Sequence, residues 1–210
     1  MHVPGSLPQC VYLLAHDPGK GRVRWGTELG LMLRAAALAD LFASGHLTDE
    51  RGRAVAVEGR RPCDDPVLEA LRQEVAGSRP RRWQHWIGHR QRAMVKAVRA
   101  QLGGDGWVRL QPYRILGLFP ATRVTIRDPR VRKALLGRVG DALRKPVGRV
   151  DPADAALVAV IAGGGLGLVL DRKARRAHKR RIKELTELSG PVGAALRAAI
   201  REAALGEGAV

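Results

Sequence analysis

One arginine stands alone in the middle of a long apolar segment. From Leu29 to Leu41 the sequence reads LGLMLRAAALADL, and Arg34 lies among leucine, methionine and alanine. A segment without a polar face predicts a helix that is buried on all sides. The positions three and four residues from Arg34 carry no carboxylate. Its anion must therefore be a distant Asp or Glu of the same fold or a bound ligand, and both alternatives stay open.

The charge balance points to a polyanionic partner. The 210 residues contain 37 Lys and Arg against 20 Asp and Glu, a formal net charge of +17. This excess predicts contact with nucleic acid or with an anionic membrane surface. The segment RKARRAHKRRIK (172–183) concentrates basic residues and reads either as a solvated helix face or as part of such a contact. Abundant Arg, Ala, Gly and Val indicate GC-rich coding, which is typical of bacteria.

A second feature is a predicted hairpin with an apolar tip, over GWVRLQPYRILGLFPATRVTIRDP (106–129). Such a tip packs against the domain or enters a bilayer shallowly, with the flanking arginines at the headgroups. Burial of each apolar side chain is worth roughly 1.5–3 kcal/mol, and each nearby basic residue adds about 1 kcal/mol at an anionic leaflet. Together these contributions predict a reversible anchor. The apolar tip residues are Ile115, Leu116, Leu118 and Phe119.

No catalytic or metal-binding pattern is evident. His85 and His89 have the spacing of two ligands on a helix, but no Glu follows His85 and no third ligand is apparent, so we expect no metal. The glycine-rich AGGGLG (162–167) lies inside an apolar run and predicts close helix packing rather than a nucleotide loop. We therefore expect no cofactor and a protein that is not an enzyme.

The helix and strand signals predict a mainly α protein, a single domain over 1–210 with two β-hairpin insertions. Asp-Pro pairs at 65–66, 128–129 and 151–152 mark helix starts. The sixteen-residue apolar run from 155 to 170 is shorter than a membrane span. Cys10 and Cys63 form no evident pair, and no signal peptide is apparent, so we expect a cytoplasmic location. The expected helices cover 9–15 (or a strand), 28–44, 67–75, 82–102, 130–144, 153–170, 172–188 and 192–205, and the first hairpin covers 46–57.

Five segments in order resemble the Golgi phosphoprotein 3 family, in a compact bacterial-type form. Eukaryotic members of that family are adaptors that bind phosphatidylinositol 4-phosphate. The resemblance implies a single helical domain with a membrane-dipping hairpin, located peripherally at the cytoplasmic face of a membrane. The five segments are LLAHDPGKGRVRW, LRAAALADLFASGHL, DDPVLEAL, LGLFPATRVTIRDP and DPADAALVAVIAGGGLG…RRIKEL.

The resemblance also implies a headgroup pocket. The family uses a Trp and an Arg nine residues later, which here are Trp25 and Arg34, plus two basic residues of a later helix. Those fall on Arg92 and on Val95, with Lys96 next to it. An arginine fork suits phosphate, and an indole suits a membrane interface.

The implied function is binding of anionic phospholipid headgroups, with tethering of membrane enzymes such as glycosyltransferases. The alternative is a nucleic-acid-binding protein that uses the basic helix and the hairpin as recognition helix and wing. A wing that touches the phosphate backbone should be polar, so the apolar tip favours the membrane.

Overall fold

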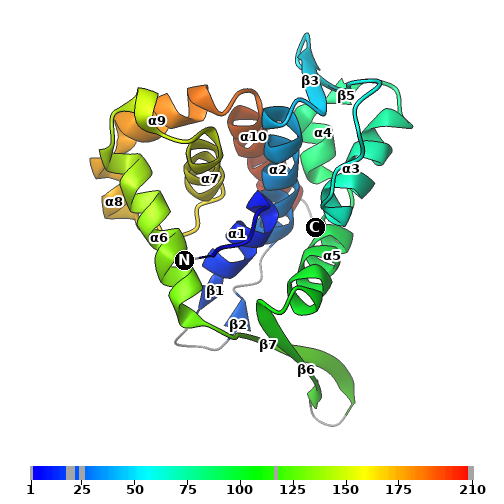
Figure 1. Ribbon diagram of the computed structural model, residues 1–210, viewed down its shortest axis with the longest axis vertical. Helices are drawn as coiled ribbons and strands as arrows, with labels where there is room; N and C mark the ends of the chain where they lie inside the picture. The colour runs from blue at the N-terminus through cyan, green and yellow to red at the C-terminus, as the bar shows by residue number, and fades with distance from the viewer. Residues whose placement is uncertain (1, 18–21, 24–26, 116–117, 208–210) are drawn as a thin grey trace.

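The computed structural model describes residues 2–17, 22–23, 27–115 and 118–207, and shows a mainly helical domain with small antiparallel sheets. The predicted fold class is confirmed. Figure 1 shows helices filling the body of the molecule and the β6–β7 hairpin extending from one end. The helices are α1 (Leu7–Leu14), α2 (Thr27–Ala43), α3 (Pro66–Ala76), α4 (Trp83–Gly88), α5 (Gln91–Gly104), α6 (Pro129–Arg144), α7 (Pro152–Gly163), α8 (Arg172–Ala177), α9 (Lys179–Leu188) and α10 (Val192–Glu207), with a 3-10 turn at Val147–Arg149. The strands are β1 (His16–Asp17), β2 (Arg22–Val23), β3 (Leu47–Glu50), β4 (Arg53–Ala56), β5 (Arg81–Arg82), β6 (Val108–Ile115) and β7 (Phe119–Ile126).

The centre of the core is α2, as its apolar sequence predicts. It packs against α1, α3, α4, α5, α7 and α10, and nearly every residue from Leu29 to Ala39 is buried. All eight residues of α1 are buried beside it. A helix that is surrounded in this way has no solvent face to offer a charged side chain, so Arg34 is buried with its neighbours.

The Asp-Pro helix starts are confirmed by hydrogen bonds. Asp65 Oδ1 accepts from the backbone N–H groups of Val67 and Leu68 at 2.8 and 3.0 Å. Asp128 Oδ1 likewise accepts from the backbone N–H of Arg130 at 2.9 Å, and Asp151 Oδ1 accepts from that of Ala153 at 2.8 Å. Each carboxylate satisfies donors that the first helical turn leaves without a partner, and the following proline needs none.

Three of the predicted helices are shorter than expected. The helix expected over 82–102 is two helices, because Arg90 takes a left-handed conformation (φ +48°) between α4 and α5. The helix expected over 172–188 divides at His178, where the backbone leaves helical geometry between α8 and α9. The helix expected over 153–170 ends at Gly163, since Gly165 has φ +68° and Leu166 N–H bonds back to Ile161 O at 3.1 Å. Three successive glycines readily end a helix in this way.

The glycine-rich segment after α7 packs closely, as predicted. A Cβ atom on Gly164 would overlap the side chain of Met32 in α2. Glycine is therefore required for α7 to approach the central helix so closely.

The first predicted hairpin is part of a three-stranded sheet of order β3-β4-β5. The additional strand, β5, pairs Arg81 with Ala54 and Arg82 with Arg53. The short strands β1 and β2 pair with each other, with His16 opposite Val23 and Asp17 opposite Arg22. The second predicted hairpin is β6–β7, with eight opposed pairs from Val108↔Ile126 to Ile115↔Phe119.

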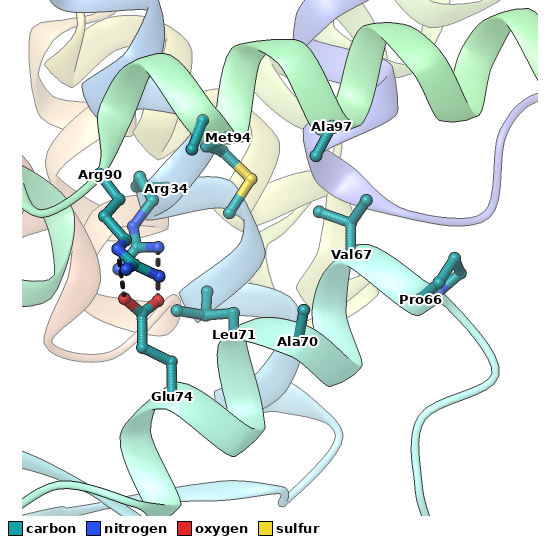
Figure 2. Close-up of a pocket in the computed structure, with 10 residues that line it drawn as sticks. Arg34, Pro66, Val67, Ala70, Leu71, Glu74, Arg90, Met94 and Ala97 are labelled. Atoms are coloured by element: carbon teal, nitrogen blue, oxygen red, sulfur yellow. Dashed lines mark hydrogen bonds and ion pairs between the residues drawn. The ribbon is translucent and has the colours of Figure 1, made fainter.

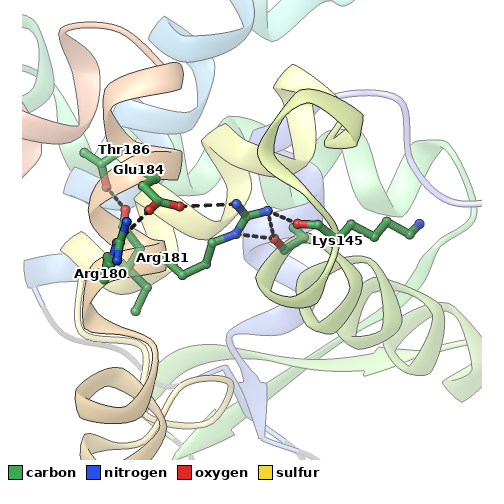
Figure 3. Close-up of polar contacts among 7 residues, drawn as sticks. Lys145, Arg180, Arg181, Glu184 and Thr186 are labelled. Carbon is green, nitrogen blue, oxygen red and sulfur yellow. Dashed lines mark hydrogen bonds and ion pairs between the residues drawn. The ribbon is translucent and has the colours of Figure 1, made fainter.

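One arginine joins α6 to α9. The Arg181 guanidinium donates from Nε and Nη2 to the Ala142 carbonyl at 3.1 and 2.9 Å, and from Nη2 to the Lys145 carbonyl (Figure 3). Its Nη1 lies 3.4 Å from Glu184 Oε2. Carbonyls at a helix C-terminus lack intrahelical donors, and a cation there also complements the helix dipole.

We predict that Arg181→Ala lowers the free energy of unfolding by about 2 kcal/mol, because two carbonyls lose a charged donor. Arg180→Ala is the matched control, since Arg180 is 94% exposed and pairs with Glu184 at the surface. Urea denaturation of both variants measures the difference. Equal effects would show that Arg181 does not cap α6.

An acid on α2 holds the start of α1. The Oδ2 atom of Asp40 accepts the Leu7 N–H at 2.6 Å. Burial raises the pKa of Asp40 to about 7, although the Leu7 hydrogen bond acts in the opposite direction. The native state therefore binds a proton at Asp40 in the range between its ordinary pKa near 3.8 and about 7, where the unfolded chain has lost it.

It follows that the Asp40 contribution to stability falls as pH rises through that range. We predict that Asp40→Asn, which keeps an oxygen acceptor without the charge, gains stability relative to the unchanged protein between about pH 4 and pH 7. Urea denaturation at several pH values measures this difference. A stability difference between the two proteins that does not change with pH would contradict the raised pKa of Asp40.

Candidate functional site

Arg34 has an intramolecular partner. Its side chain is 3% exposed, and Nη1 lies 2.9 Å from Oε2 of Glu74 on α3. Its Nε donates to the Trp86 carbonyl on α4 at 2.8 Å. Of the two alternatives for its anion, the distant carboxylate is therefore present in the structure (Figure 2). Through this one side chain, α2 is bonded to α3 and to α4.

The charge around Glu74 is positive in sum. Its Oε1 atom lies 3.2 Å from His89 Nε2 and 4.0 Å from Arg90 Nε, so one carboxylate faces two guanidinium groups. Burial lowers the pKa of Arg34 from its ordinary value, the Glu74 contact opposes this, and the charge of Arg90 adds to it. The Arg34 guanidinium stays protonated at neutral pH. Among the described residues, Arg34 Nη2 finds no hydrogen-bond partner.

A groove of about 380 Å³ opens beside this ion pair, between α3 and α5. Figure 2 shows the charged groups at one end of it and apolar side chains along the rest. Such a groove suits a ligand with an anionic head and an apolar body. It is lined by Arg34, Pro66, Val67, Ala70, Leu71, Glu74, Arg90, Ala93, Met94 and Ala97.

Two sequence features position the groove. A Cβ atom on Gly30 would lie 2.6 Å from Gln91 Cβ, so glycine allows the start of α5 to lie directly against α2. On α3, Val67 and Leu71 face the core, and Glu74 is three residues further along the same face. The carboxylate therefore points to the same side as the apolar residues that bury it.

The residues expected to bind a headgroup are not all brought together. Arg92 and Lys96 are exposed on α5, but the groove beside Arg34 is lined by other residues of that helix. Val95, at the expected second basic position, is 8% exposed. Trp25 lies outside the described residues.

The hairpin expected to enter a membrane is packed at its base and exposed at its tip. Val108 and Val124 are buried at the base, whereas Leu118 at the turn is 75% exposed and Tyr113 is 46% exposed. Ile115 ends β6 and Phe119 begins β7. Leu116 and the side chains of Ile115 and Phe119 lie outside the described part of the chain. The base of the hairpin therefore packs on the domain, whereas Leu118 at the turn does not.

The two histidines stack on each other. The rings of His85 and His89 lie 5.6 Å apart, and His89 faces Glu74. Where the structure describes the chain, it groups no three His, Cys, Asp or Glu side chains in a way that could hold a metal. No helix in that part of the chain combines the length and apolar character needed to cross a bilayer.

Sequence reasoning missed Glu74 and Arg90. The position of Glu74 on the buried face of an amphipathic helix was a usable signal, because an acid there needs a cation. Arg90 gave no comparable signal, since its place beside Glu74 depends on the left-handed break before α5.

These features define a mainly helical protein with a projecting hairpin and a cationic, half-apolar groove. The Golgi phosphoprotein 3 (GPP34) family model matches residues 7–203, and the chain belongs to this family. The resemblance seen in the sequence is thereby confirmed over nearly the whole chain. No curated protein matches the chain. Proteins of this family are non-enzymatic adaptors, and membership implies peripheral association with a membrane.

We predict that Glu74→Gln lowers the free energy of unfolding by about 3 kcal/mol, because it leaves the Arg34 charge buried without an anion. Arg34→Met combined with Glu74→Leu should recover most of that loss, since the buried charge is then absent. The control is Glu187→Gln, whose partner Lys183 is 78% exposed. Urea denaturation measures the free energy of unfolding of each variant. A loss for Glu74→Gln no larger than for the control would contradict a buried ion pair.

Proposed function

We propose that this protein is a peripheral membrane adaptor that binds anionic phospholipid headgroups, phosphatidylinositol 4-phosphate among them. The observation that carries the proposal is the β6–β7 hairpin, which projects from the helical body (Figure 1). Leu118 at its turn is 75% exposed. Family membership supports the same function.

The hairpin has the composition of a shallow membrane anchor. Arg109, Arg114 and Arg123 are exposed along its strands, and Arg127 is exposed directly after β7. The Arg123 guanidinium lies over the Tyr113 ring at 5.8 Å, so an amphipathic ring and a cation lie together below the turn. Tyrosine and arginine at this level suit the headgroup region, with Leu118 and its apolar neighbours in the acyl layer.

The headgroup itself is proposed to bind through Trp25, Arg34, Arg92 and Lys96. Arg92 and Lys96 are one helical turn apart and exposed, so both can reach one phosphate-bearing ligand. The two guanidinium groups around Glu74 leave a net positive charge beside the groove. This charge supports an anionic ligand there.

As an adaptor, the protein would act at the cytoplasmic face of a membrane. We propose that it tethers membrane enzymes such as glycosyltransferases there, which follows from the family resemblance. The excess of basic residues supports attraction to an anionic leaflet.

We predict that the protein co-sediments with anionic vesicles and that Leu118→Asp weakens this binding at least about tenfold. A charged side chain at the turn removes the apolar contribution and adds repulsion. Leu188→Asp, at a 46% exposed leucine on α9, is the matched control and should leave binding unchanged. Neutral vesicles should bind little.

Headgroup selectivity is measured in the same assay with vesicles of equal charge, with and without phosphatidylinositol 4-phosphate. Arg92→Gln with Lys96→Gln should abolish any preference for the phosphoinositide.

Equal loss of vesicle binding with Leu118→Asp and Leu188→Asp would contradict insertion of the hairpin. Binding to duplex DNA without binding to any vesicle would favour the nucleic-acid alternative instead.

A further inference from the structure

A second cationic site lies at the far end of the molecule from the hairpin. Figure 1 places β3 and β5 at one end of the longest axis and the β6–β7 hairpin at the other. Four arginines line a cleft of about 470 Å³ there, which we call the arginine cleft. Its lining consists of Arg53, Arg79, Pro80, Arg81, Arg82, Gln84, His85 and Glu202.

The fold brings these arginines together against their mutual repulsion. Arg53 and Arg82 are directly opposed in the antiparallel pair β4–β5. Like charges in opposed positions destabilise a sheet. Over the described residues, none of the four arginines forms an ion pair with a carboxylate. Because Glu202 is the one acid among the described residues that line the cleft, four guanidinium groups leave an excess of positive charge there.

The acids near the cleft are engaged or lie outside it. Glu202 accepts a hydrogen bond from the Gln84 amide at the rim. Asp49 Oδ1 accepts a hydrogen bond from the indole N–H of Trp83, the first residue of α4, at 2.5 Å. Glu50 opposes Arg53 on the other side, in β3, and is not part of the cleft lining.

Three of the four arginines stand on paired strands, Arg53 on β4 and Arg81 and Arg82 on β5. Arg53 Nη1 donates to the Pro80 carbonyl at 3.1 Å, which fixes its side chain across the entry to β5. The next residue after β5, Trp83, is 2% exposed and meets the Phe42 ring edge-on at 5.6 Å. A ligand therefore meets one guanidinium that is already positioned and a backbone that is anchored in the core, which lowers the entropy lost on binding.

His85 adds a hydrogen-bonding group to the cleft. Burial, and then the positive charge of Arg81, lower the pKa of His85 below its ordinary value. The imidazole is therefore neutral at pH 7 and can both donate and accept.

We propose that the arginine cleft binds a ligand that carries a chain of linked phosphates. Four guanidinium forks around one compact space match several neighbouring phosphate groups, each of which can accept two hydrogen bonds from an arginine. A single-stranded nucleic acid would instead use an extended basic track with aromatic rings for stacking, and the described residues that line this cleft include no Trp, Tyr or Phe.

The phosphate chain belongs to a ligand in solution rather than to the bilayer that receives the hairpin, because the strands that build the cleft lie at the opposite end of the molecule (Figure 1). This origin of the ligand rests on the proposed membrane function, whereas the phosphate binding itself does not. A nucleoside triphosphate and inorganic tripolyphosphate share this chemistry, so both are used as probes.

Isothermal titration calorimetry of the full chain with tripolyphosphate and with ATP, at physiological salt, tests the proposal. We expect saturable binding that Arg81→Gln with Arg82→Gln weakens at least about tenfold. Arg172→Gln with Arg176→Gln removes the same charge from the exposed face of α8 and should leave affinity unchanged. Arg79 lies outside the strands, so Arg79→Gln should also lower the affinity for tripolyphosphate without disturbing the pairing of β5.

The rim acid gives a change of opposite sign, since Glu202→Gln should tighten binding. Tighter binding of ATP than of tripolyphosphate would identify a nucleotide, and equal affinity would identify the phosphate chain alone. Absent binding, equal loss in the α8 control, or binding of single-stranded RNA without tripolyphosphate would each overturn the proposal. Vesicle binding of the Arg81→Gln, Arg82→Gln protein should be normal, which separates this site from the membrane function.

Discussion

The fold depends on one buried charge. Arg34 lies in the central helix, where every neighbour on the same helix is apolar, and the structure pairs it with Glu74 and with the Trp86 carbonyl. An isolated guanidinium there would cost several kcal/mol. The position of α3 and α4 against α2 is therefore set by electrostatics as well as by apolar packing, and the groove between α3 and α5 opens beside this contact.

Around that centre the molecule has two chemically different ends. One carries the β6–β7 hairpin, with an exposed leucine at its turn and arginines along its strands. The other carries the arginine cleft, built on the three-stranded sheet. The charge excess evident in the sequence is thus distributed over both ends, and the basic face of α8 and α9 is a third cationic region. A peripheral protein with this layout can contact a membrane and an anion in solution at once.

Local signals predicted most of the fold. Asp-Pro pairs located three helix starts, and the apolar run around Arg34 identified the central helix. The missed features are tertiary. The break at Arg90 and the strand β5 depend on packing between segments, and the pairing of Arg34 with Glu74 joins residues forty positions apart. The candidate site was predicted less well for the same reason, because the side of α5 that faces Arg34 is set by that packing.

The most direct test of the account is the environment of the hairpin turn on a membrane. Leu118→Cys is labelled with a polarity-sensitive dye in a Cys63→Ser protein; Cys10 resists labelling because it is buried and its pKa is raised to about 12. On anionic vesicles we expect a blue shift and quenching by brominated acyl chains, with no change for the same dye at Arg82→Cys. Vesicle binding without a response at position 118, or with a response at position 82 instead, would contradict it.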